Sequence, residues 1–279
     1  MADISLKVRA KINLSLGING VTENGYHDLD MLLASVDGIY DIIRVYDSNE
    51  IVVTMDGKVQ DERNTAYKSL ALIKDRFGVV MSADIKKGIP FSAGLGGSSC
   101  DSAGVFCAFH ALHGVKMDTL IPLADEVGSD VAFMMRGGAA ISRGQGSDLT
   151  YVELPCLDVV VMKAKGGSNT GAVFRHYDSL TLKSTIDNPT LVAKIQQGKD
   201  YSSLMLNQLY VPASELNDEI ARLYLEAKKI TNYVVMSGSG SSIVAVVHNA
   251  QEKERLLALA ESAEYSIATR TISHGVDKA

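Results

Sequence analysis

A glycine- and serine-rich stretch at residues 90–99, Pro-Phe-Ser-Ala-Gly-Leu-Gly-Gly-Ser-Ser, constrains the fold of this chain more than any other segment. Three glycines and three serines fall within eight residues. An alternating segment, 81–86, precedes it, and a run of apolar and small residues, 103–112, follows it. This order predicts a strand, a glycine-rich loop and a helix. Because glycines let the backbone approach a ligand and a helix N-terminus offers unpaired N–H groups, we expect an anion site, most often one for phosphate.

Spacing excludes two common phosphate motifs. A P-loop ends in Gly-Lys-Ser/Thr, whereas Gly97 is followed by Ser98 and Ser99 with no lysine. A dinucleotide-binding fingerprint needs a third glycine at position 99, which is serine here. A second interpretation stays open, in which the small residues only let a helix pack tightly on a sheet.

The composition is that of an ordinary globular protein, with 46% hydrophobic and 22% charged residues over 279 positions, enough for one large domain or two of usual size. The net charge of −6 argues against general nucleic-acid binding. No apolar run approaches the roughly 20 residues that span a membrane, so we expect neither nucleic acid nor membrane as a partner. The three cysteines show no metal-ligand spacing, which favours a reduced cytoplasmic protein.

Hydrophobic periodicity predicts an α+β chain with strands and helices in both halves. Helices are expected from the Asn64-Thr65 cap to Gly78 and at 99–113, 117–127, 170–177, 188–197, 214–229 and 250–262. Strands are expected at 3–10, 12–20, 39–46, 50–55, 80–86, 139–144, 150–154, 158–163, 232–236, 242–247 and 264–271.

Lys11 and Asp130 are the candidate catalytic residues. In the alternating segment 9–16, Lys11 shares one strand face with Asn13 and Ser15, which suits a strand that lines a site but also an exposed sheet face. Asp130 follows a glycine turn and precedes an apolar run, so its carboxylate is a candidate to orient or accept a proton. An aspartate in that place could equally cap a helix.

Two further segments are candidate ligand contacts. The run 237–241, which includes Gly238 and Gly240, lies between two predicted strands and could approach a phosphate or substrate, or form a hairpin of small residues. Tyr26 could stack on a base and His27 could hydrogen-bond with it. A lone histidine near a turn is, however, more often simply exposed.

Taken in order, these segments resemble the GHMP small-molecule kinases. That family has a lysine-bearing N-terminal strand, a Pro-x-x-x-Gly-Leu-(Gly/Ala)-(Gly/Ser)-Ser-Ser motif and a glycine-rich segment between C-terminal strands. Their counterparts here are residues 9–16, 90–99 and 236–242. The resemblance implies two domains, a ribosomal-protein-S5-like nucleotide-binding domain at 1–154 and a ferredoxin-like α/β sandwich at 155–279.

Within the family, the chain is most similar to the branch whose acceptor carries a cytidine diphosphate group. The segments that carry this likeness are 10–14, 25–27 with Asp37, 128–131 and 169–174. The chain departs from that branch by Ser98 for glycine, Cys100 for serine, Ser129 for alanine, Ala132 and Asn169 for proline, and Gln208 for an acidic residue.

The resemblance implies ATP and Mg²⁺ as cofactors and phosphoryl transfer to a hydroxyl group in isoprenoid precursor biosynthesis. Asp130 would lie beside the attacking hydroxyl, and Lys11 would polarise that hydroxyl and hold Asp130. The residues implied at the nucleotide are Pro90, Gly94, Leu95, Gly96, Gly97, Ser98, Ser99, Asn64 and Lys87. Those implied at the substrate are Asn13, Tyr26, His27, Thr170, Phe174, Gly238 and Gly240. The ligands of Mg²⁺ are left open.

Two alternatives remain. A homoserine- or mevalonate-type kinase would take a smaller acceptor, but Tyr26 and His27 argue against it because those acceptors carry no base. A nucleotide-binding regulator without turnover would not need both Lys11 and Asp130. In each case a monomer or homodimer is expected.

Overall fold

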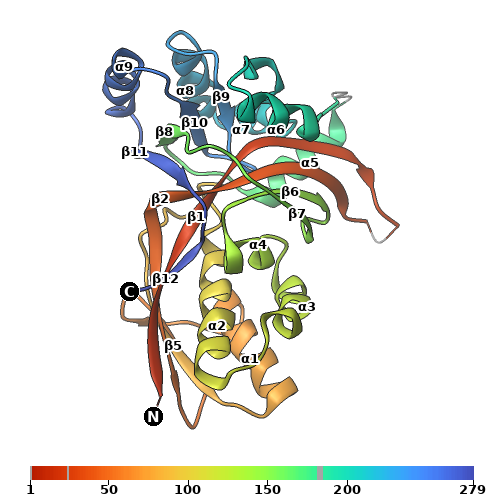
Figure 1. Cartoon of the computed structure of the whole chain (residues 1–279), viewed down its shortest axis with the longest axis vertical. Coiled ribbons are helices and arrows are strands. Elements are labelled where there is room, and N and C mark those ends of the chain that lie inside the picture. Colours follow the sequence, from red (N-terminus) through yellow and green to blue (C-terminus); the bar gives the residue numbers. More distant parts are fainter. Residues whose placement is uncertain (1, 24, 181–184) are drawn as a thin grey trace.

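Two long antiparallel strands run along most of this elongated molecule, as the computed structural model shows (Figure 1). The structure describes residues 2–23, 25–180 and 185–279. Strand β1 (Asp3–Val21) pairs with β2 (His27–Asp47) from Asp3↔Tyr46 to Val21↔His27. Register shifts, the first between Arg9 and Lys11, accompany the bend of this ribbon between the lower and upper halves of the view.

The lower half is a sheet covered by helices on one face (Figure 1). There β2 pairs with β5 (Met81–Lys86), which pairs in parallel with β3 (Val53–Met55), and β4 (Lys58–Val59) forms the edge. The covering helices are α1 (Thr65–Phe77), α2 (Gly97–His113), α3 (Met117–Val127) and α4 (Val131–Arg136).

Helix α2 is the central helix of this half. Its residues 100–109 are all buried, and Gly104 lets it approach the sheet because a Cβ there would lie 2.8 Å from the Ile43 side chain. Residues this small and apolar on all faces predict a buried helix, which the structure confirms. The predicted order of strand, glycine-rich loop and helix is therefore correct.

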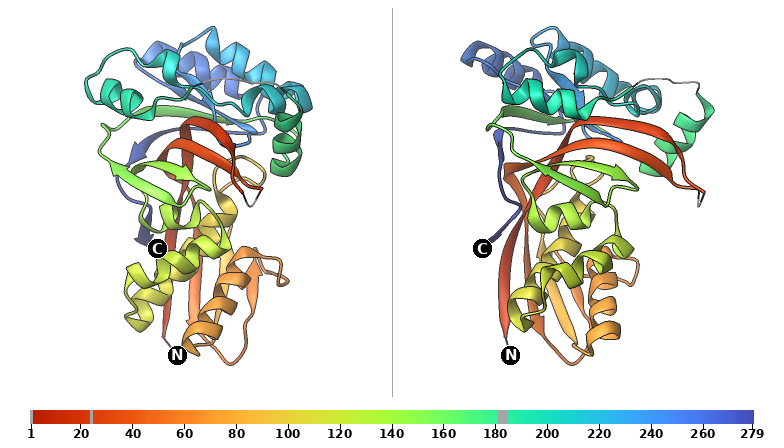
Figure 2. Two further views of the ribbon diagram at one scale, coloured as in Figure 1. Left: turned by 90° about the vertical axis from the view of Figure 1, so that its right-hand side faces the viewer. Right: turned by 45° about the vertical axis from the view of Figure 1, so that its right-hand side comes forward.

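The upper half has a second layer of helices on the outer side of its strands (Figure 2). Strand β8 (Asp158–Lys163) pairs with β10 (Ser242–Val246) and β11 (Tyr265–Ile272), and β10 pairs with β9 (Val234–Met236). The helices are α5 (Thr170–Ser179), α6 (Asn188–Gln196), α7 (Tyr210–Leu216), α8 (Asp218–Lys228) and α9 (Ala250–Ala260), with a short 3₁₀ turn at Ser202–Leu204.

The two halves share strands. Strand β11 also pairs with β2, and the C-terminal β12 (Val276–Lys278) pairs with β1. The hairpin of β6 (Ala139–Gly144) and β7 (Asp148–Val152) adds to β2. The α+β class is confirmed, while the domain division at 154/155 stays a prediction.

Besides the short elements β4, β12 and the 3₁₀ turn, which were not expected, three larger differences from the sequence-based expectation are seen. Residues 27–38 are strand, α4 is an additional helix, and the helix expected at 214–229 is two helices that meet at Asn217, whose side chain caps α8.

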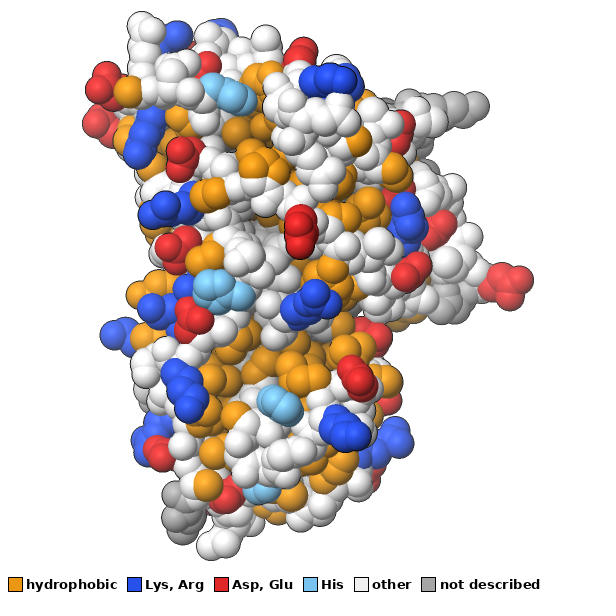
Figure 3. All heavy atoms as spheres, in the orientation of Figure 1, with side chains coloured by type: hydrophobic (Ala, Val, Ile, Leu, Met, Phe, Trp, Pro, Cys, Tyr) orange, Lys and Arg blue, Asp and Glu red, His pale blue; other side chains and the backbone are white. Residues whose placement is uncertain are grey.

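No helix within the described ranges is long and apolar enough to cross a membrane. Figure 3 shows acidic, basic and apolar side chains interspersed on one face, so charge is spread over this surface.

Candidate active site

A cleft of about 600 Å³ brings together segments that are far apart in the sequence. Its lining includes residues of β1 and β2, the segment at the start of α1, the loop before α2, the turn before α4, the start of α5 and the turn between β9 and β10. The predicted site residues that line it are Lys11, Asn64, Lys87, Pro90, Gly94, Leu95, Gly96, Gly97, Ser98, Ser99, Asp130, Thr170, Phe174 and Gly238. Four others, all within the described chain, lie outside the lining: Asn13, Tyr26, His27 and Gly240.

The glycine loop, defined here as residues 90–99, takes backbone conformations that suit glycine. Gly94 has φ of 73° and Gly96 has φ of 79°. A Cβ at Gly94 would lie 2.1 Å from the carbonyl oxygen of Ser237, so only glycine fits there. Helix α2 then begins at Gly97, and no side chain in the described part of the protein caps it. Its first N–H groups therefore suit an anion in the cleft.

Lys11 and Asp130 meet at the cleft. The Nζ atom of Lys11 lies 3.3 Å from Oδ2 of Asp130. Asp130 stands at the N-cap position of α4, yet its side chain makes no capping hydrogen bond with the described residues. The carboxylate is thus paired with Lys11, and the helix-capping interpretation of Asp130 is wrong.

Asn13 lies beneath this pair. It is fully buried, and its Oδ1 accepts hydrogen bonds from Lys11 Nζ at 2.7 Å and from the Gly238 N–H at 3.0 Å. Lys11 and Ser15 are also buried, so the exposed-face interpretation of β1 is wrong. These contacts hold Lys11 against the turn between β9 and β10.

The turn at 237–241 is the hairpin of small residues that the sequence allowed, and its approach to a phosphate or substrate stays a prediction. It connects the antiparallel strands β9 and β10, and it packs on the glycine loop. The Ser237 hydroxyl donates to the Gly94 carbonyl at 2.9 Å. Gly238 lines the cleft, whereas a Cβ at Gly240 would face Met236 at 3.0 Å.

An aromatic pair stands near the far end of the cleft. The His27 ring lies 4.6 Å from the Phe174 ring, and its Nε2 is 2.7 Å from Oδ1 of Asp178. Thr170, at the start of α5, shares a hydrogen bond of 2.8 Å with Ser239. Tyr26 is 62% exposed. His27 is therefore held by specific contacts, unlike an isolated surface histidine.

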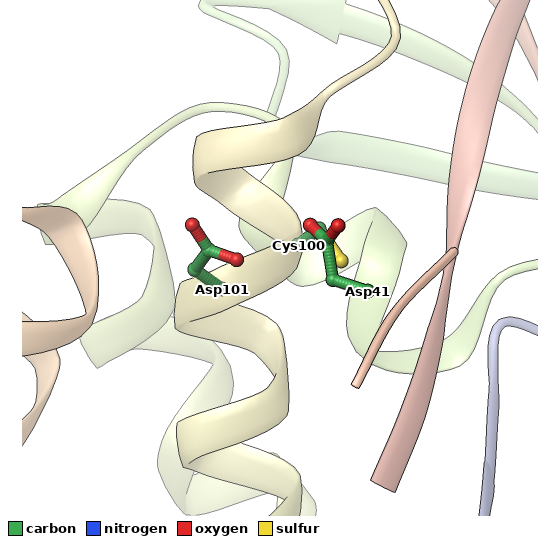
Figure 4. Close-up of side chains that lie close together, drawn as sticks. All are labelled: Asp41, Cys100 and Asp101. Carbon is green, nitrogen blue, oxygen red and sulfur yellow. The ribbon is translucent and has the colours of Figure 1, made fainter. Parts of the chain in front are cut away.

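A buried charged cluster, defined here as Asp41, Lys87, Cys100 and Asp101, lies under the glycine loop. Lys87 Nζ is 2.5 Å from Asp41 Oδ2 and 3.0 Å from Asp101 Oδ1. Figure 4 shows Asp41 and Asp101 on either side of the first turn of α2, with the Cys100 sulfur beside Asp41. Sequence reasoning missed both aspartates. The available signal was that Asp41 takes a core-facing position in the alternating row Ile39, Asp41, Ile43.

The buried charged cluster holds more acidic than basic groups, with two carboxyl groups and one ammonium group. Burial raises the pKa of Asp101 to about 7, where the Asp41 carboxylate adds to the effect and Lys87 opposes it. Burial lowers the pKa of Lys87, but Asp101 and Asp41 together outweigh it and raise that pKa. Burial raises the pKa of the Cys100 thiol, which donates to the Val8 carbonyl at 3.3 Å. With Lys87 between the carboxylates, the cluster does not suit a metal ion.

Comparison with known proteins adds a family match. A model described as the GHMP kinases N terminal domain matches residues 64–138, which include the glycine loop and Asp130. The 4-diphosphocytidyl-2-C-methyl-D-erythritol kinase of Bacillus pumilus strain SAFR-032 is 32% identical over 266 residues, covering 90% of each chain. The enzyme of the same name from Bacillus cereus strain AH187 is 32% identical over 272 residues, again over 90% of each chain.

Solved structures show the same fold. A crystal structure of 4-(cytidine 5'-diphospho)-2C-methyl-D-erythritol kinase aligns with a TM-score of 0.79 at 26% identity, covering 96% of this chain and 99% of that one. Homoserine kinase from Cytophaga hutchinsonii aligns with a TM-score of 0.75 at 17% identity, covering 99% and 97% respectively. The latter likeness concerns the fold alone.

Proposed function

The chain belongs to the GHMP kinase family and is thus a small-molecule kinase, and we propose that it transfers the γ-phosphoryl group of ATP to the 2-hydroxyl group of 4-diphosphocytidyl-2-C-methyl-D-erythritol. This reaction belongs to isoprenoid precursor biosynthesis. Relatives that carry this substrate in their name, at 32% identity over 90% of the chain, support the choice. The observation that carries it is the Lys11–Asp130 pair, which lies in the same cleft as the glycine loop and Phe174.

Phosphoryl transfer passes through a loose transition state, so a kinase works mainly by positioning and charge stabilisation. The N–H groups at the start of α2, in Gly97, Ser98 and Ser99, bind the phosphates. Asp130 orients the acceptor hydroxyl and takes its proton late in the transfer. Lys11 holds the Asp130 carboxylate and polarises the hydroxyl. Asn64 and Lys87 also line the cleft, which supports their assignment to the nucleotide.

The cytosine base of the acceptor stacks on Phe174, with His27 and Tyr26 around it and Thr170 beside it. The 2.7 Å contact between His27 Nε2 and Asp178 supports a fixed imidazole orientation. The turn of Gly238 and Gly240 lines the acceptor side. The contacts of Asn13 favour a positioning role for its amide, which holds Lys11 and Gly238, over direct contact with the substrate.

Mg²⁺ would accompany the triphosphate, as is usual for kinases. Asp130 is the carboxylate exposed at the cleft, with 21% of its side chain accessible, but its Oδ2 is already paired with Lys11, so the protein ligands of Mg²⁺ stay open. The ion would neutralise charge on the phosphate oxygens. We also propose that residues 1–154 form the nucleotide-binding domain and 155–279 the second domain, that the protein acts in the cytoplasm where ATP is available, and that it is a monomer or homodimer.

The family alternatives predict other acceptors. An assay of ADP release from Mg·ATP should compare 4-diphosphocytidyl-2-C-methyl-D-erythritol with homoserine and mevalonate at equal concentrations. The proposal predicts release with the cytidyl acceptor alone. Release of ADP with homoserine or mevalonate instead would show that the chain is a kinase of the same family with a different acceptor. A protein that binds ATP but releases no ADP with any acceptor would be the non-catalytic regulator.

A further inference from the structure

Asp41 is a fully buried carboxylate at a core-facing position of β2. Its neighbours on the same strand face, Ile39 and Ile43, are apolar and buried. A charge in such a row is costly unless it is fully hydrogen-bonded. The proposed reaction gives Asp41 no direct part, because it does not line the cleft.

Three of the donors that Asp41 meets, in Lys87, Gly88 and Ile89, come from one short segment ahead of the glycine loop. Its Oδ1 accepts the N–H of Gly88 at 2.7 Å and of Ile89 at 2.9 Å. Its Oδ2 accepts from Lys87 Nζ at 2.5 Å. The backbone lies tightly against β2 here, since a Cβ at Gly88 would be 2.2 Å from the Tyr40 carbonyl oxygen. Asp41 therefore anchors the chain at the point where it enters the loop.

Lys87 extends this anchor to the other end of the loop. The same ammonium group donates to the Gly97 carbonyl at 3.2 Å and lies 3.0 and 3.1 Å from the two oxygens of Asp101. Gly97 and Asp101 belong to the first turns of α2. The segment that leads into the glycine loop, 88–89, is thus tied directly to Asp41, and Gly97 near the end of the loop is tied to it through Lys87.

We propose that Asp41 is the positioning residue of the glycine loop, which holds the loop and the first turn of α2 in the geometry that binds the nucleotide phosphates. The inference rests on the proposed nucleotide role of the loop. Backbone N–H groups bind an anion well only when they are fixed in place before it arrives. Loss of the anchor should therefore weaken nucleotide binding and leave the acceptor side unaffected.

The test is calorimetric titration of ADP into Asp41→Asn. The amide keeps the shape of the side chain, but it cannot accept from both the 88–89 backbone and Lys87. Loss of a hydrogen bond to a charged group corresponds to roughly a tenfold to hundredfold change in affinity. We expect the Kd of ADP and the KM of ATP to rise by that factor, and the KM of the acceptor to stay within about twofold.

A matched control separates this effect from lost stability. Lys163 is also buried and pairs with Glu264 at 2.5 Å, outside the cleft lining. Lys163→Met should lower the thermal midpoint without changing the Kd of ADP. An equal loss of ADP affinity in both variants, or none in folded Asp41→Asn, would overturn the proposal.

A double-mutant cycle covers the case in which Asp41→Asn folds poorly. Lys87→Met and the double variant Asp41→Asn/Lys87→Met complete the cycle, and the double variant has no unpaired ammonium group. The proposal predicts that the two losses of ADP affinity overlap, because both residues act through one anchor. Fully additive losses would mean that Lys87 binds the nucleotide on its own and that Asp41 does not position it.

ADP binding does not involve the acceptor. The positioning role of Asp41 can therefore be tested independently of the proposed acceptor. A wild-type protein that binds ADP but does not phosphorylate the cytidyl acceptor would contradict the proposed substrate and leave the Asp41 test valid. A wild-type protein that does not bind ADP would contradict both.

Discussion

The ammonium group of Lys11 lies 3.3 Å from the Oδ2 atom of Asp130, although 118 residues separate them in the chain. Lys11 comes from a long strand, and Asp130 from the turn that starts a short helix. The pair is held from below by Asn13, which also binds the backbone of Gly238. Lys11 and Asp130 are therefore linked through Asn13 to the turn that packs on the glycine loop, and a substitution in one of these elements should alter the geometry of the others.

Lys11→Met should lower kcat by about 10²-fold or more while the KM of ATP changes little, because the variant loses an interaction proposed for the transition state. Initial rates at varied ATP and acceptor concentrations measure this. If only the KM of ATP rose, Lys11 would belong to the nucleotide site.

Gly94→Ala should destabilise the protein strongly, because its Cβ would lie 2.1 Å from the Ser237 carbonyl oxygen. Gly57 is the matched control: its φ of 79° is close to the 73° of Gly94, and no atom lies within 4 Å of its added Cβ. Urea unfolding should show a loss of about 1 kcal/mol for Gly57→Ala and clearly more for Gly94→Ala. Equal losses would mean that backbone conformation alone demands glycine at 94.

Asp101 should make the stability of the protein fall as pH rises from about 4 to 7. Its pKa is about 7 in the folded state against an ordinary value of 3.8, so between these values the unfolded chain loses the proton while the folded protein keeps it. The slope is about 1.4 kcal/mol per pH unit, and it levels off above pH 7. Asp101→Asn removes this ionisation.

The measurement is the free energy of unfolding of Asp101→Asn and wild type in urea at pH 5 and pH 7. The free energy of unfolding of the variant, relative to that of wild type, should be larger at pH 7 than at pH 5. A difference that does not depend on pH would contradict the assignment of the retained proton to Asp101.

Phe174→Ala should raise the KM of the acceptor about tenfold and leave the KM of ATP unchanged, since stacking on an aromatic side chain stabilises a bound base by about 1–3 kcal/mol. Phe174→Tyr keeps the ring and serves as the control. An unchanged acceptor KM in the alanine variant would remove Phe174 from the base site.

Local patterns predicted the parts of the fold that local residues determine. The glycine loop, the Asn64 cap and the buried α2 each follow from a short stretch of sequence. Residues 31–36 are buried on both strand faces, so they show no alternation, and the first half of β2 was missed for that reason. Helix α4 has six residues, too few for a helical period.

The site was predictable in part only. The meeting of Lys11 with Asp130 came from the family resemblance, because no spacing rule joins residues on separate elements. The anchor of Asp41 was not predicted, since it depends on how β2 faces the segment at 87–89. Asn13 was expected at the substrate, and its burial under Lys11 depends on the packing of the β9–β10 turn.

The most direct test of the proposed mechanism is the turnover number of Asp130→Asn with Mg·ATP and 4-diphosphocytidyl-2-C-methyl-D-erythritol, measured alongside ADP binding. We predict a fall in kcat of about 10²–10⁴-fold, as expected for loss of a positioned acid–base group, with the Kd of ADP within a few-fold of wild type. A variant that keeps most of its turnover would contradict the role of Asp130 and the mechanism built on it.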